Sequence, residues 1–110
     1  AGMSILEMPS RPTAVVAVND LTAVGLVNAF CEGGLRVPED ISVSGFDNTY
    51  LAAYFVPRLT SVDMHPDVLG RTAADALHDA ITSPASGAKE YAIKIDLVVG
   101  KSTGPAPASS

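Results

Sequence analysis

Residues 34–48 constrain the fold of this chain more than any other stretch, because they combine a helix end, a turn and a buried strand. Gly33 and Gly34 favour the left-handed backbone that ends a helix, and Pro38 cannot continue one. A short apolar run with β-branched side chains then occupies residues 41–46. Such a run predicts a strand that is covered on both faces. The chain therefore switches here from helix to strand.

The preceding residues extend this pattern into an α/β unit. Residues 13–18 are apolar and β-branched, which predicts another buried strand. Between the two strands, four apolar residues repeat at helical spacing and form one stripe: Ala23, Leu26, Val27 and Phe30. A strand, a helix and a strand in this order form a parallel crossover unit. We therefore predict the α/β class, with an open, mostly parallel sheet flanked by helices.

The second half of the chain predicts three further elements and a tail. Residues 49–56 are expected to form a short helical turn, and residues 59–63 a third strand. A long helix is predicted for residues 66–81, where Pro66 suits a first helical position and six residues share an apolar face: Leu69, Ala73, Ala76, Leu77, Ala80 and Ile81. Alternation over residues 91–99 predicts a strand with one wet face, near a sheet edge.

Several motifs resemble the effector-binding domain of LacI/GalR-type bacterial transcription regulators. In that family, a helix ending Gly-Leu-x-Val-Pro-x-Asp leads into a strand ending Gly-[Tyr/Phe]-Asp-[Asp/Asn], as residues 34–40 and 45–48 do here. The family-like pieces at residues 17–20, 56–62 and 69–70 follow in the expected order. The resemblance implies part of a type I lobe of the periplasmic-binding-protein-like fold.

The resemblance also implies how the chain is organised. Residues 1–102 are expected to be the C-terminal part of an effector-binding domain, and residues 103–110 a flexible tail, because they are too small and polar to pack. The first lobe and a helix-turn-helix domain would lie outside this chain. Since the family packs the helix at residues 66–81 on the first lobe, we expect its apolar face to be covered here by refolding onto its own sheet or by a second copy.

Polar residues that follow the first two strands are the candidate ligand contacts. Ligands of open α/β sheets bind beyond the carboxyl ends of the strands, where Asn19 and Asp20 follow the first strand and Asp47 and Asn48 the second. A carboxylate and an amide suit a sugar or a nucleoside. Asp20 is more readily explained as a helix cap than as a ligand contact. Asn19 could instead cap the helix or form a turn, and an Asx-turn explains Asp47 about as well as ligand binding does. The resemblance implies that Asn19 and Asp47 are effector contacts.

Other side chains are assigned by their context. Tyr54 and Phe55 would fit the core of a monomer. The resemblance implies that this segment helps to form a dimer face, so that a core and an interface are equally good interpretations. Cys31 is expected to be a small buried residue. His65 and His78 have no cysteine or carboxylate at metal-ligand spacing, so we interpret them as surface histidines and predict no metal.

Charge and composition argue against direct binding of this chain to DNA or to a membrane. The chain has 110 residues and a net charge of −5, and its seven basic residues are spread singly. Without a basic patch, DNA binding is expected only through a helix-turn-helix domain outside these residues. No apolar stretch approaches the roughly 20 residues that span a membrane. One cysteine cannot form an internal disulfide and fits a reducing cytoplasm.

The preferred interpretation is a ligand-sensing and dimerising module of a LacI-type, DNA-binding transcription regulator with a sugar-like or nucleoside-like effector. The alternative is a fragment of an extracytoplasmic sugar-binding protein of an ABC transporter. We do not expect an enzyme, because no nucleophile or acid and base pair occurs at useful spacing. No phosphate-binding loop is present, and no cofactor is predicted.

Overall fold

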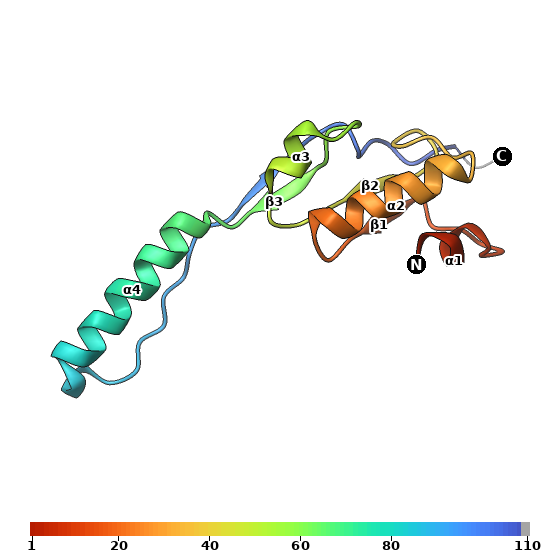
Figure 1. Cartoon of the computed structure of the whole chain (residues 1–110). Coiled ribbons are helices and arrows are strands. Elements are labelled where there is room, and N and C mark those ends of the chain that lie inside the picture. Colours follow the sequence, from red (N-terminus) through yellow and green to blue (C-terminus); the bar gives the residue numbers. More distant parts are fainter. Residues whose placement is uncertain (109–110) are drawn as a thin grey trace.

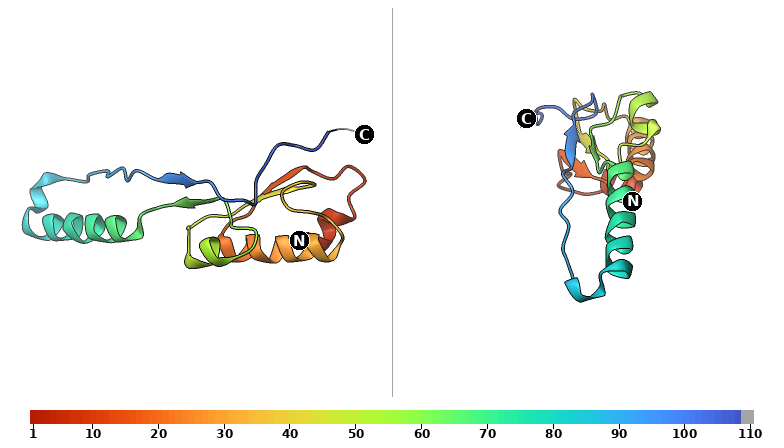
Figure 2. Two further views of the ribbon diagram at one scale, coloured as in Figure 1. Left: turned by 90° about the horizontal axis from the view of Figure 1, so that it is seen from above. Right: turned by 90° about the vertical axis from the view of Figure 1, so that its left-hand side faces the viewer.

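The chain folds into a small α/β body from which a helical arm projects (Figure 1). The computed structural model describes residues 1–108, apart from the side chain of Ser86. Its extents are 63 × 28 × 22 Å, and its radius of gyration is 18.8 Å, against about 13 Å for a compact chain of this length. Two further views show the same separation between the body and the arm (Figure 2).

The body is built on the predicted strand, helix and strand unit. Strand β1 (Ala14–Val16) pairs in parallel with β2 (Ser42–Ser44), with Val15 opposite Val43. Helix α2 (Asp20–Glu32) connects them and buries its predicted stripe: Ala23, Leu26, Val27 and Phe30. The parallel pair and its covering helix confirm the α/β prediction.

The end of α2 also follows the sequence pattern. Gly33 closes the helix, and Gly34 adopts a φ of 86°, which residues with a Cβ rarely adopt. The Leu35 amide then donates to the Phe30 carbonyl at 2.9 Å, so that carbonyl is satisfied as the chain leaves the helix. Helix α1 (Gly2–Leu6) packs its last side chains against the same core.

A second two-stranded sheet lies on the far side of β2 and is linked to it by an isolated bridge. Strand β3 (Ser61–Asp63) follows a parallel bridge between Ser44 and Thr60. It pairs in antiparallel fashion with β4 (Asp96–Val98). The predicted turn over residues 49–56 contains α3 (Tyr50–Tyr54), which is anchored by a 2.9 Å hydrogen bond from the Leu59 amide to the Ala52 carbonyl.

The arm consists of α4 (Pro66–Thr82), the 3-10 turn η1 (Pro84–Ser86) and the segment that returns beside α4. None of the residues of α4 is buried. Leu69, Leu77 and Ile81 therefore expose the apolar face, at 42%, 64% and 70% of their surface. The expectation that this face refolds onto the chain's own sheet is wrong, because α4 extends away from that sheet (Figure 2).

The strand predicted for residues 91–99 is mostly wrong. Only β4 pairs, because β3 offers three residues and then turns into α4. Residues 87–95 are not in a strand. The predicted apolar face is not covered either, since Tyr91, Ile95, Leu97 and Val99 are exposed. The alternating sequence therefore favours a strand, but the described residues offer a partner strand only to residues 96–98.

The C-terminal segment returns to the body and is hydrogen-bonded there. Ser102 is fully buried, and its hydroxyl accepts from the Thr60 amide at 2.9 Å and donates to the Val43 carbonyl at 2.5 Å. The hydroxyls of Thr103 and Thr60 lie 2.7 Å apart, and the Gly104 amide donates to the Ser42 hydroxyl at 3.1 Å.

The boundary drawn between residues 102 and 103 stays a prediction. Hydrogen bonds of Thr103 and Gly104 nevertheless tie the start of the predicted tail to the body. Residues 109–110 of that tail lie outside the described part of the chain.

One further expectation is wrong. Cys31 is exposed, because it lies on α2 immediately after the buried Phe30, on the side that faces away from the sheet.

Within residues 1–108, no helix has both the length and the apolar character needed to cross a bilayer.

Candidate functional site

The carboxyl ends of β1 and β2 lie side by side, as the sequence predicted. Beyond the last paired residues, the Ala17 amide donates to the Ser44 carbonyl at 2.8 Å, and the Asp20 amide donates to the Phe46 carbonyl at 3.0 Å. The residues adjoining the second bond are Asn19 and Asp47. Both predicted ligand contacts therefore lie at the same edge of the sheet.

Asn19, and not Asp20, caps helix α2. The Asn19 side-chain oxygen accepts from the Thr22 amide at 2.8 Å, three residues into the helix, as an N-cap does. The prediction that Asp20 is the cap is wrong, because Asp20 is already the first helical residue and its side chain turns inward. The capping bond uses the Asn19 oxygen, and the described residues give its amide nitrogen no partner, so that group can still donate to a ligand.

Asp20 forms a buried polar centre beneath this edge. Its carboxylate is fully buried and accepts three hydrogen bonds: from the Thr49 amide at 2.7 Å, the Thr49 hydroxyl at 3.1 Å and the Ser61 hydroxyl at 2.6 Å. A buried charge needs such partners, because desolvation is costly. Nothing in the spacing of the sequence signalled this role, since its partners are 29 and 41 residues away.

The loop of residues 46–49 carries Asp47 outward. Asp47 and Asn48 adopt φ values of 97° and 48°, an uncommon conformation for two successive residues that carry a Cβ. The Asp47 amide donates to the Val62 carbonyl at 3.0 Å, and the Asn48 amide to the Ser61 hydroxyl at 3.0 Å. The loop is thus attached to the adjoining strand β3.

The Asp47 carboxylate is exposed and makes no hydrogen bond to any described residue. An Asx-turn would require it to accept from the main chain just beyond it, but the Thr49 amide donates to Asp20 instead. The Asn48 side chain is already engaged, because its amide nitrogen donates to an Asp63 oxygen at 3.3 Å. Of the two loop residues, Asp47 is therefore the one whose acceptors are left for a ligand.

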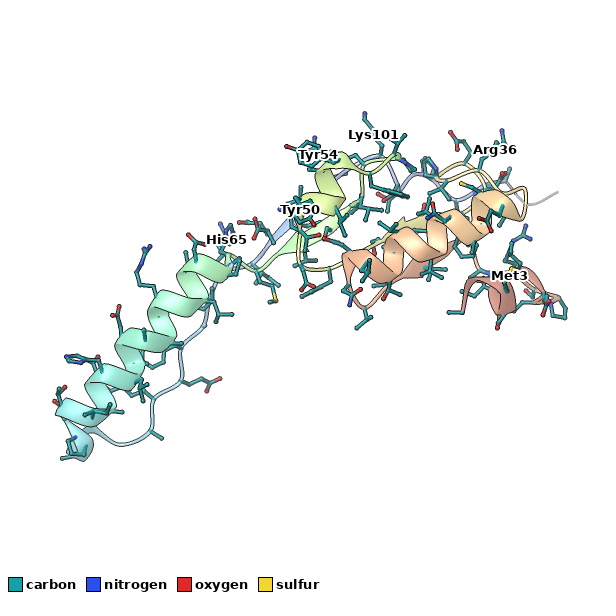
Figure 3. The ribbon with its side chains drawn as sticks, in the orientation of Figure 1. Met3, Arg36, Tyr50, Tyr54, His65 and Lys101 are labelled. Carbon is teal, nitrogen blue, oxygen red and sulfur yellow. The ribbon has the colours of Figure 1, made fainter. Side chains whose placement is uncertain are left out.

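A second polar cluster lies where the body meets the arm (Figure 3). The His65 ring nitrogen Nε2 lies 2.6 Å from an Asp96 oxygen, and the His65 amide donates to Asp63 at 2.8 Å. The hydrogen bond to Asp96 raises the pKa of His65, assisted by the negative charges of Asp63, Asp96 and Asp67. The hydrogen bond from the His65 amide lowers the pKa of Asp63. This cluster joins the two segments that cross between body and arm.

His78 is exposed, as expected, whereas His65 is half-buried at the junction of body and arm. Among residues 1–108, no group of three or more histidine, cysteine or acidic side chains is arranged to hold a metal ion.

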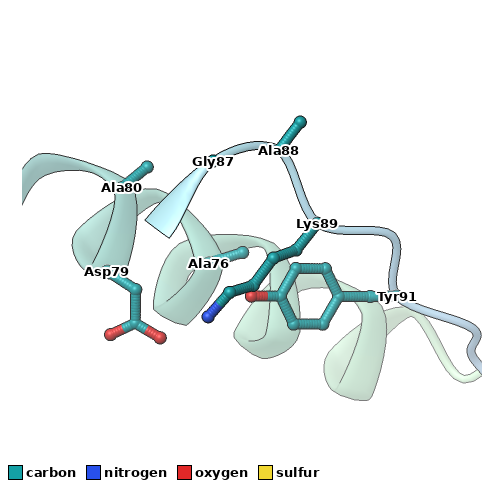
Figure 4. A pocket seen from close by; sticks show the side chains of 7 residues that line it. All are labelled: Ala76, Asp79, Ala80, Gly87, Ala88, Lys89 and Tyr91. Atoms are coloured by element: carbon teal, nitrogen blue, oxygen red, sulfur yellow. The ribbon is translucent and has the colours of Figure 1, made fainter. Parts of the chain in front are cut away.

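Two cavities lie along the arm. Figure 4 shows one of about 160 Å³ between α4 and the returning segment, lined by Ala76, Asp79, Ala80, Gly87, Ala88, Lys89 and Tyr91. Another lies near the start of α4, with Val68 and Ile93 in its walls. Neither cavity is the proposed ligand site, because both are formed by an arm whose helix buries none of its residues.

The structure separates the two candidate interface residues. Phe55 is partly buried and packs against the core, whereas Tyr54 leaves 83% of its surface exposed. Tyr50, one helical turn earlier, is also exposed, and the figure shows both rings on α3 (Figure 3). An interface on this helix would therefore be formed by Tyr54 more than by Phe55.

Comparisons with known proteins agree with this architecture. A family model for the periplasmic binding protein-like domain matches residues 2–103. The HTH-type transcriptional repressor PurR of Edwardsiella ictaluri is 42% identical over 107 residues, which cover 97% of this chain and 31% of the repressor. This chain thus spans about a third of that relative's length.

Solved structures give the same result. The lac repressor dimer bound to operator and an anti-inducer superposes with a TM-score of 0.84 at 34% identity, covering 93% of this chain and 35% of the repressor. A LacI family regulator from Enterococcus faecium with bound ribose superposes with a TM-score of 0.82 at 32% identity, covering 98% of this chain and 39% of the regulator.

Proposed function

We propose that this chain senses a small polyhydroxylated effector for a transcription regulator. The chain belongs to the periplasmic binding protein-like domain family and is part of the effector-binding domain of a LacI-family regulator. The effector would be a sugar or a nucleoside. Relatives named as repressors favour regulation over the transport alternative. A regulator of this kind would work in the cytoplasm and would read DNA through residues outside this chain.

The observation that carries this proposal is the shared edge of β1 and β2. It presents the amide nitrogen of Asn19 and the carboxylate of Asp47, neither of which is hydrogen-bonded to another residue in the described part of the chain, next to a main-chain hydrogen bond between their neighbours. A carboxylate accepts from adjacent hydroxyls, and an amide nitrogen donates to a hydroxyl or ring oxygen. These groups match the hydroxyl-rich edge of a pentose, which occurs in both sugars and nucleosides.

The same proposal includes a homodimer in which the exposed rings of α3 take part. Tyr54 and its neighbour Tyr50 are exposed aromatic residues, a residue type enriched at interfaces. The lac repressor structure with a similar fold is a dimer. Exchange of Tyr54 for Asp should weaken dimerisation, which sedimentation would detect, without loss of folding.

Isothermal titration calorimetry on the proposed full-length regulator tests the effector site. The probes are ribose, cellobiose and adenosine, the first two because they are bound in similar structures. Asp47→Ala should lower the affinity for the probe about 10- to 150-fold, since a hydrogen bond to a charged group contributes roughly 1.5–3 kcal/mol. Asp67→Ala, an exposed aspartate on α4, is the matched control. Unchanged affinity in Asp47→Ala would refute the site.

A further inference from the structure

We propose that Asp20 is a positioning residue for the effector site: it holds both ends of the loop 46–49 and so sets the direction of the Asp47 carboxylate. The inference deepens the proposed function, on which it rests for the identity of the loop as a ligand contact. Asp20 itself is fully buried and would not touch the ligand.

The two ends of the loop are bound to the same residue. At the first end, the Phe46 carbonyl accepts from the Asp20 amide at 3.0 Å. At the last end, the Thr49 amide and hydroxyl donate to one oxygen of the Asp20 carboxylate, at 2.7 and 3.1 Å. Only Asp47 and Asn48 lie between these anchors, so their backbone has little freedom to change direction.

The conformation between the anchors needs this support. Both residues have positive φ, which costs free energy for any residue with a Cβ and persists only where surrounding contacts determine it. A relaxed loop would return to negative φ and turn Asp47 away from the edge that it shares with Asn19. Asp20 therefore acts on the ligand contact through backbone geometry.

Strand β3 completes the arrangement. The Ser61 hydroxyl donates to the second Asp20 oxygen at 2.6 Å and accepts from the Asn48 amide at 3.0 Å. The carboxylate thus determines which way this hydroxyl points, and the hydroxyl in turn binds the middle of the loop. An amide in place of the carboxylate would present a donor to one of these donors.

Space around the carboxylate is restricted as well. A Cβ on Gly45 would collide with the Asp20 side-chain oxygen and come within 3.1 Å of its Cα. Gly45, directly after β2, therefore leaves the space that the buried carboxylate occupies. This second, steric contact means that the carboxylate cannot shift toward β2 without moving the strand.

The test compares Asp20→Asn with Asp67→Asn, which removes an exposed carboxylate from the first turn of the other long helix. The intraresidue amide-to-Hα NOE of Asp47 and Asn48, which is strong at positive φ, and the hydrogen exchange of the Thr49 amide are recorded on the chain. Asp20→Asn should weaken both NOEs and speed that exchange, and Asp67→Asn should change neither. Ser61→Ala should produce the same change at Asn48 alone.

Effector titration with the probe identified above gives the second measurement. Asp20→Asn should weaken binding about tenfold, because the displaced Asp47 carboxylate would lose its charge-assisted hydrogen bond to the probe. Asp67→Asn should bind the probe with the affinity of the wild type. If Asp20→Asn only lowers the melting temperature and leaves the Asp47 signals and the affinity unchanged, the inference is wrong. If the wild type binds no probe but the NOEs respond, the proposed function fails and the positioning role stands. Should Asp20→Asn fail to fold, Thr49→Val, which removes one donor, takes its place in both measurements.

Discussion

Leucine-to-alanine exchanges on the two long helices should differ several-fold in cost, although both leucines belong to apolar stripes. Leu26 on α2 leaves only 5% of its surface exposed, whereas Leu77 on α4 leaves 64%. A buried Leu→Ala exchange loses the transfer free energy and leaves a cavity, which together cost about 2–5 kcal/mol. This is a large part of the roughly 5–15 kcal/mol that stabilise a domain.

The exposed leucine contributes far less. Full burial of a leucine side chain contributes about 1.5–3 kcal/mol, and Leu77 buries roughly a third of its surface, so its removal should cost about 0.5–1 kcal/mol. The higher helix propensity of alanine offsets a few tenths of that value. Leu77→Ala should therefore remain within about 1 kcal/mol of the wild type.

Hydrogen exchange of the Val43 amide measures this difference. That amide donates to the Ser102 carbonyl in the centre of the body at 2.9 Å, so its slowest exchange reports global unfolding. The reasoning is refuted if Leu77→Ala lowers the free energy of unfolding as much as Leu26→Ala does. That result would mean that α4 is covered in solution, and a dependence on protein concentration would identify a second copy as the cover.

Three further predictions concern the cap, the junction and the ligand. Asn19→Ala should lower the free energy of unfolding by about 1 kcal/mol through loss of the α2 cap, measured by urea denaturation, whereas a change below 0.3 kcal/mol would remove the capping assignment. Because the pKa of His65 is raised above 6.5 in the fold, its contribution to stability should be fully present below about pH 6.5 and be lost as the pH rises through the raised value. Urea midpoints at pH 6 and pH 8 should show this loss in the wild type but not in His65→Gln; an equal loss in the variant would assign it to other groups. The 110-residue chain alone should bind ribose much more weakly than the proposed full-length regulator does, since a ligand between two lobes is contacted from both sides. Equal affinities in calorimetry would contradict a two-lobed site.

Local chemistry was sufficient to predict most of the body from the sequence. The α2 stripe, the glycine stop and the apolar runs of β1 and β2 each depend on neighbours within a few residues, so spacing alone locates them. The same holds for the placement of Asn19 and Asp47 beyond adjacent parallel strands. Their role as ligand contacts remains a proposal.

Long-range contacts decided what the sequence could not. It assigned the cap to Asp20 because both Asn19 and Asp20 suit that position, and only the presence of Thr49 and Ser61 shows that the carboxylate is needed inside. It also predicted a full strand over residues 91–99, because alternation records a preference for pairing but not whether a partner strand is available.

The sequence by itself determined the main helix and the paired strands of the body, where α2 ends, and which of its faces is apolar. Only the tertiary structure decided which apolar faces are covered, which polar side chains are buried, and that the Asp47 carboxylate is exposed. The physical reason is range: helix ends and apolar periodicity depend on residues within one or two turns, whereas burial and polar partners depend on segments that folding brings together from tens of residues apart.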